Sequence, residues 1–190
     1  MTLTALIDCD CKRLNSYFYK LFDVLGEAIA EDQTAPLEAH DIEASESQAT
    51  YHSFANFIKP DMLMNIYSLV DFWMKEICMY LKSKNNLSLS YKDIKGDHDL
   101  QIYQKYLTKY AGLDLNAAQV SYEYLDALRK IRNQFIHSGG HVPSDKEKVL
   151  SVINGITLHG SLIVIDNSFV WITLDHAKKY LYAAAQALGD

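Results

Sequence analysis

The segment from residue 60 to residue 82 constrains the fold most, because it is apolar on two sides when wound as a helix. One face carries apolar side chains at helical spacing: Leu63, Ile66, Tyr67, Val70, Trp73, Met74, Ile77 and Leu81. The other face adds Leu69, Phe72 and Met79. Lys59-Pro60-Asp61 predicts the helix start, since proline suits a first turn. Such a helix lies at the centre of a bundle or faces a partner subunit.

The same periodicity predicts further helices along the chain. The spacing of Leu3, Phe18 and Leu25 indicates one helix over much of 3–30, followed by a polar connection or short helix over 31–47. After a turn-rich stretch with Asn85-Asn86, a third helix runs over about 100–110 and ends at Gly112. A fourth runs over about 120–137 and is closed by Gly139-Gly140. We therefore expect a helical bundle.

The character of the chain changes after residue 143. Ser144-Asp-Lys-Glu147 resembles a capping box that opens a short helix through about Ile153. The apolar runs 162–165 and 169–172 flank Asp166-Asn-Ser168 and predict a β-hairpin, with 156–158 as a third strand. Thr173 is then the cap of a last helix through Leu188.

These elements predict a mainly α fold of four to five helices, with a hairpin appendage at about 156–172 and a final helix. The chain has 190 residues, of which 49% are hydrophobic and 22% charged, which favours a single compact domain over 1–190. Cys9, Cys11 and Cys78 lack the spacing of a zinc site and are typical of free thiols in a reducing cytosol. No basic leader or long apolar run is seen, so we expect a cytoplasmic protein without a membrane segment.

The net charge of −6 is unevenly distributed. Between Lys20 and Lys59 there is no Lys or Arg, and this interval holds eight Asp and Glu residues. The run is typical of a solvated surface, with steering of a basic partner as the alternative. Outside it the chain can meet phosphate locally, although it lacks the broad basic stripe of a tight duplex binder.

Polar chemistry is concentrated at the end of the fourth predicted helix. Asn133 and His137 are four residues apart and share one face, whereas Arg132 lies ~140° around the helix from His137. Histidine can take and give a proton near neutral pH, and the arginine fork can hold a phosphate. These groups suit metal-free RNA cleavage, in which a base activates the 2′-hydroxyl and an acid protonates the leaving 5′-oxygen. The alternative is an ordinary helix C-cap with a surface charge.

Arg132-Asn133-x-x-x-His137 resembles the signature of HEPN (higher eukaryotes and prokaryotes nucleotide-binding) domains. Ser68-x-x-Asp71 is similar to the Ser-x-x-acid pattern of some HEPN helices, with Asp where Glu is commoner. The motif covers six residues, and the order of helices extends the similarity loosely to most of the chain. Where nucleotidyltransferase-paired toxins often carry Tyr two residues after the histidine, this chain has Gly139.

The resemblance implies a dimeric helical bundle and a metal-independent endoribonuclease, a toxin of a toxin–antitoxin pair or a phage-defence effector. Arg132 and His137 would be catalytic, Asn133 would orient the site, and Asp71 would support it. The implied partners are RNA, a second copy of the chain, and an antitoxin or defence-system protein, with no metal or cofactor. A catalytically silent HEPN-like binding or scaffold module is the alternative.

The sequence contains no motif for another kind of chemistry. The sequence has no glycine-rich phosphate loop, no Gly-x-Ser-x-Gly elbow and no His-Glu-x-x-His. The remaining histidines, such as His98, lack ligand spacing and are expected at the surface or satisfied. His141, four residues after His137, is a weaker candidate for a neighbour of the site.

Overall fold

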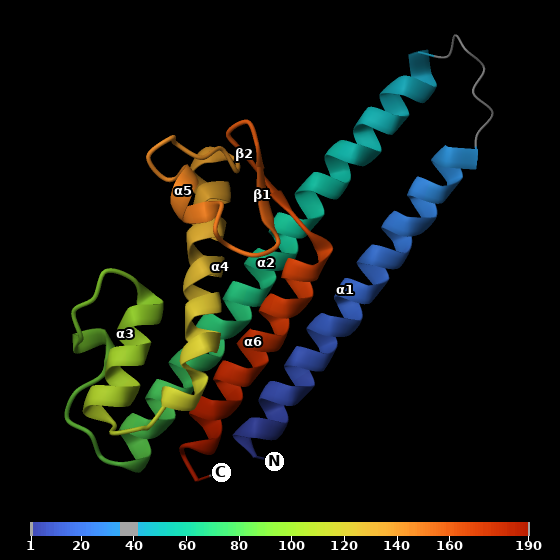
Figure 1. The fold of residues 1–190 in the computed structure, drawn as a ribbon. Helices are drawn as coiled ribbons and strands as arrows, with labels where there is room; N and C mark the ends of the chain where they lie inside the picture. The colour runs from blue at the N-terminus through green and yellow to red at the C-terminus, as the bar shows by residue number, and fades with distance from the viewer. Residues whose placement is uncertain (1, 35–41, 190) are drawn as a thin grey trace.

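The computed structural model describes residues 2–34 and 42–189, and this part of the chain is mainly helical (Figure 1). The helices and strands are α1 (Leu3–Thr34), α2 (Ile42–Lys84), α3 (Asp99–Lys105), α4 (Gln119–Ser138), α5 (Glu147–Leu150), β1 (Ile156–His159), β2 (Leu162–Ile165) and α6 (Asn167–Gln186). Short turns of other helix types are η1 (Tyr91–Asp93), η2 (Tyr106–Tyr110) and η3 (Asn116–Ala118). No described helix is both long enough and apolar enough to span a membrane.

Four long helices form the bundle. Helix α6 packs against α1, α2 and α4, and α2 packs against α1 and α4, with α3 at the side of α2 (Figure 1). Their facing sides supply a core in which Phe18, Ile66, Leu128 and Tyr180 have no exposed surface. Burial of such large side chains contributes about 1.5–3 kcal/mol each, which offsets the entropy lost on ordering the helices. The predicted mainly α bundle with a small hairpin and a final helix is confirmed.

Helix α2 is the central element that its two-sided pattern predicts, but its predicted start is wrong. The helix begins at Ile42, and Pro60 lies inside it. A proline removes one backbone hydrogen bond, and a long helix can remain continuous through that loss. Towards the bundle, Ile66 and Met74 are fully buried, whereas Phe72 is 52% exposed on the other side.

The connection predicted over 31–47 is shorter in the structure. Residues 31–34 belong to α1 and residues 42–47 to α2, whereas 35–41 lie outside the described residues. The predicted first helix is confirmed and extends to Thr34. The third and fourth predicted helices are also confirmed, as α3 with η2 and as α4.

The C-terminal part corrects three local predictions. The hairpin pairs β1 with β2 through Gly160, so 156–158 is the partner strand, and 169–172 begins α6 instead of forming a strand. Phe169, Val170 and Leu174 are buried on one face of α6, so packing against the bundle decides in favour of helix. Thr173 is therefore a buried residue within α6 and not its cap.

The capping box predicted at Ser144–Glu147 does not form. Helix α5 begins at Glu147 after Lys146 and has no side-chain cap. The amide of Lys146 donates to the Pro143 carbonyl at 2.9 Å, so residues 143–146 form a turn instead of a helix entry. Helix α5 also ends at Leu150, before the predicted Ile153.

Candidate active site

Two glycines end α4 immediately after the Arg132–His137 motif. Gly139 and Gly140 have φ values of +58° and +86°, and their amides bond to the carbonyls of Phe135 and Gln134. This is the left-handed stop predicted for the helix. The chain then joins the hairpin, since Ile163 N donates to Gly140 O at 3.0 Å and Val142 N to Ser161 O at 2.8 Å. The hairpin thereby holds the segment that follows the motif.

Arg132 lies half-buried between α4 and α2. Its guanidinium carbon is 5.0 Å from the centre of the Tyr67 ring, and Nη1 donates to Asn133 Oδ1 at 3.1 Å. Burial first, and then the nearby Asp71 charge, raises the pKa of Tyr67, which keeps the phenol neutral beneath the cation. The Asn133 side chain therefore holds one nitrogen of the arginine fork.

A depression of about 280 Å³ opens between α2, α4 and the start of α3. Its lining includes Ser68 and Asp71 from α2, together with Arg132 and Asn133 from α4. The two patterns that the sequence singled out, 64 residues apart for Ser68 and Arg132, thus meet around one hollow. Helix packing, and not proximity in the sequence, brings them together.

Asp71 is held by two donors. Tyr103 Oη donates to Oδ1 at 2.7 Å, and Lys75 Nζ lies 2.6 Å from Oδ2. The hydrogen bond to Asp71 raises the pKa of Lys75, and burial together with that same carboxylate raises the pKa of Tyr103. Both carboxylate oxygens are engaged, so neighbouring side chains fix the Asp71 carboxylate at the rim of the depression.

His98 lines the same depression, and sequence reasoning gave it no role there. Its Nδ1 accepts from the Gln101 amide at 3.2 Å as the cap of α3, which leaves the ring proton on Nε2, 3.7 Å from Asp126 Oδ1. Burial, followed by the Arg129 charge, lowers the pKa of His98. The sequence offers one indication of a role for His98, its position directly before a helix, and this indicates a helix cap and not a functional site.

His137 lines a second depression, of about 560 Å³, between α4 and α5. The imidazole is exposed and makes no hydrogen bond within the described ranges 2–34 and 42–189. Asn133 lines this hollow as well, as expected for residues four apart on one helix face. Arg129 also belongs to both depressions.

The structure does not bring Arg132 and His137 into a single hollow. Arg132 lines the first depression and His137 the second, with Asn133 between them. Five residues along a helix correspond to a rotation of ~140° between the two side chains, so one chain presents them in different directions. His141 joins neither hollow, because its Nδ1 lies 3.0 Å from Ser161 Oγ in the hairpin.

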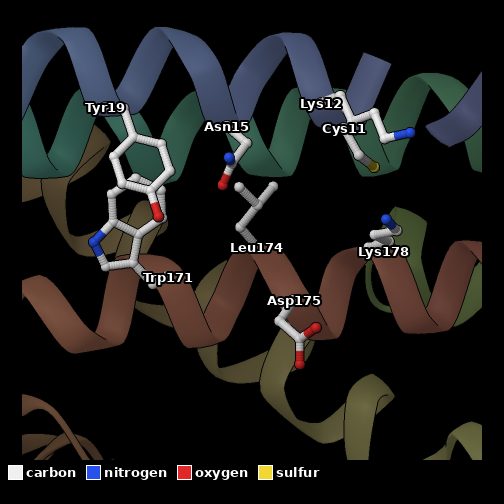
Figure 2. A pocket seen from close by; sticks show the side chains of 8 residues that line it. All are labelled: Cys11, Lys12, Asn15, Tyr19, Trp171, Leu174, Asp175 and Lys178. Atoms are coloured by element: carbon white, nitrogen blue, oxygen red, sulfur yellow. The ribbon is translucent and has the colours of Figure 1, made fainter. Parts of the chain in front are cut away.

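A further depression, of about 370 Å³, lies between α1 and α6 on other elements (Figure 2). Trp171 meets Tyr19 there with ring centres 4.6 Å apart. Its cations Lys12 and Lys178 both pair with Asp8, whose pKa those hydrogen bonds lower. These ion pairs join α1 to α6 and leave both lysines paired, so we do not take this depression as the candidate site.

Thiol and metal chemistry find little support. Burial raises the pKa of Cys11 to about 11 and that of Cys78 to about 12, which disfavours their thiolates at neutral pH. Among the described residues, no group of three or more His, Cys, Asp or Glu side chains is placed to hold a metal ion.

Comparisons of the chain with protein-family models, curated proteins and solved structures gave no match.

Proposed function

We propose that the protein is a metal-independent endoribonuclease of the HEPN type, with Arg132 and His137 in a site completed by a second copy of the chain. One observation carries the proposal. The Arg132–Asn133 pair on α4 and the Ser68–Asp71 pair on α2 surround one open hollow, with exposed His137 one turn further along α4.

The chemistry follows from the groups present. An imidazole takes the proton of the RNA 2′-hydroxyl, whose oxygen then bonds to the adjacent phosphorus. The bond from phosphorus to the 5′-oxygen breaks, and that oxygen receives a proton from an imidazolium, so a 2′,3′-cyclic phosphate remains. Arg132 neutralises the phosphate charge as it grows, and Asn133 holds the guanidinium in place.

Two proton transfers need two groups, and each chain contributes one exposed histidine in this motif. A two-fold dimer with its axis near the end of α4 would place a second His137 across the phosphate. Ile136, between the motif residues, is 45% exposed, which fits a surface that is covered on dimerisation. An enzyme of this kind would act as a toxin or phage-defence effector, with an antitoxin or defence-system protein as its partner.

A catalytically silent HEPN-like module is the second candidate, and a specific observation favours it. The Arg132 guanidinium is already occupied by Tyr67 and Asn133. A silent module would keep this arrangement for stability and would tolerate loss of His137.

The test is cleavage of single-stranded RNA by purified protein in a metal chelator. We expect 2′,3′-cyclic phosphate ends from the wild type and a loss of about 100-fold or more in His137→Ala and Arg132→Ala. His159→Ala and Arg13→Ala are matched controls, because both residues lie outside the two hollows, and circular dichroism verifies folding. Cleavage that survives His137→Ala, or no cleavage by folded wild type, contradicts the proposal.

A further inference from the structure

The depression beside His137 is large enough to hold a small ligand. At about 560 Å³ it falls within the range of about 300–1,000 Å³ that is typical of small-ligand sites. One wall is the last three turns of α4, and the other is formed by residues of the segment 143–150, which follows directly after the residues 140 and 142 that bond to the hairpin. Residues that matter for its chemistry are Lys130, His137, Pro143, Lys146 and Leu150.

The charge of this cleft is positive, although the chain carries −6 overall. Arg129, Lys130 and Lys146 line it, and none of its lining residues in the described part of the chain is acidic. Asp126 pairs with both Arg129 and Lys130, at 2.8 Å and 2.9 Å, so one carboxylate serves two cations. Lys146 is exposed and has no ion pair among residues 2–34 and 42–189. An anion is therefore the matching ligand.

The floor of the cleft is apolar. Pro143 is exposed at its edge, and Leu150 is 3% exposed beneath it. A cation at the rim and an apolar floor suit a ligand that has a phosphate on one side and a flat ring on the other. A nucleotide of a single strand has both parts free, whereas the bases of a duplex are stacked inside the helix and out of reach.

We infer that the α4–α5 cleft binds the nucleotide next to the scissile phosphate of single-stranded RNA, with Lys146 holding a backbone phosphate. The inference rests on the proposed function, since it places the strand across His137. The strand then continues over Asn133, which lines both hollows, towards Arg132. Lys146 is a substrate-binding residue and takes no part in proton transfer.

The experiment measures binding without cleavage. A fluorescent 2′-O-methyl RNA of mixed sequence is titrated at several salt concentrations, because it lacks the attacking hydroxyl and stays intact. We expect Lys146→Ala to weaken binding about three- to tenfold, and to reduce the salt slope by about 0.7, the value for one contact to a single strand. Lys109→Ala, an exposed lysine outside both hollows, should match the wild type. The same RNA as a duplex should bind more weakly.

Each outcome separates this inference from the proposed function. With cleavable RNA, Lys146→Ala should raise KM and leave kcat within about twofold, because its contact is the same in the ground and transition states. If the wild type cuts RNA but Lys146→Ala binds like Lys109→Ala, the cleft assignment is wrong and the ribonuclease stands. Lys146-dependent binding without cleavage would keep the cleft and remove the ribonuclease. If the wild type neither cuts RNA nor shows Lys146-dependent binding, the inference is overturned. Duplex RNA that binds as tightly as the single strand overturns it as well.

Discussion

At the scale of single residues, the side chains of the candidate site are held by their neighbours. Tyr67 lies beneath the Arg132 guanidinium, Tyr103 and Lys75 engage Asp71, and Asn133 accepts from Arg132. These contacts restrict the side chains, which under the proposed function would lower the ordering cost of binding RNA. Both oxygens of the Asp71 carboxylate are engaged in this way.

His98 gives the unfolding free energy a pH dependence with a definite sign. Burial and Arg129 lower its pKa below the ordinary value of 6.5, while Asp126, Asp97 and Asp99 oppose the shift. The unfolded chain therefore takes up the proton first, and the stabilisation present above pH 6.5 is lost as the pH falls through the folded-state pKa. His176, whose pKa burial and Lys179 also lower, acts in the same direction.

The variant His98→Asn isolates this contribution, because asparagine also caps helices but does not titrate. We expect His98→Asn to retain the wild-type unfolding free energy at pH 7.5 and to lose less of it at pH 5.5. Relative to His98→Asn, His98→Ala should cost about 1 kcal/mol at both pH values through the lost cap. Urea unfolding at the two pH values measures this. An equal pH-dependent loss in wild type and His98→Asn would show that His98 is not the titrating group.

At the scale of elements, the end of α4 decides where the hairpin lies and thereby shapes the cleft beside His137. Gly140 makes a close approach that Gly139 does not. A Cβ on Gly140 would lie 2.6 Å from Phe135 Cε1, whereas one on Gly139 would meet nothing within 4 Å. Both positions have positive φ, so both substitutions strain the backbone.

The two glycines therefore provide a matched pair. Gly139→Ala should lower the unfolding free energy by about 1 kcal/mol, the cost of the left-handed conformation alone. Gly140→Ala should lower it by about 2–4 kcal/mol, since the Phe135 ring must also move. Urea unfolding with unchanged m-values is the measurement. Equal losses of unfolding free energy in the two variants would mean that the Phe135 ring can move aside without measurable cost.

Helix periodicity predicted the elements whose packing is regular along their length. The residues of α4 face the core at helical spacing, and its glycine stop is local, so its bounds follow from the sequence almost to the residue. The start of α6 could not be found in this way. Phe169 and Val170 are adjacent apolar residues that suit a strand equally well, and their burial against the bundle settles the choice.

The candidate site shows the same division between local and tertiary information. Asn133 and His137 share a face because rotation along one helix requires it. The meeting of Asp71 with Arg132 depends on how α2 packs against α4, and the approach of Lys146 to His137 depends on the path of the chain after Gly140, neither of which a local pattern contains. The predicted start at Pro60 is wrong for a related reason, because proline's preference for a first turn is a local tendency that a longer helix can override.

At the scale of the whole molecule, the two hollows raise a question of subunit number. Arg132 and His137 diverge around α4, and one chain offers one histidine of the motif. If cleavage needs two histidines, a dimer of wild type with His137→Ala is inactive. If each chain carries an independent site, the wild-type chain in that mixed dimer keeps its activity.

Mixing after subunit exchange separates these cases. With a composite site, activity per wild-type chain falls to about half at equal amounts of His137→Ala, and to about a tenth with a ninefold excess, because only wild-type pairs cut. His159→Ala, mixed with wild type in the same ratios, should leave the activity per wild-type chain unchanged. Sedimentation at the assay concentration reports the oligomeric state. Activity that stays proportional to the wild-type chain, or a monomer that cuts RNA, would place both proton transfers within one chain.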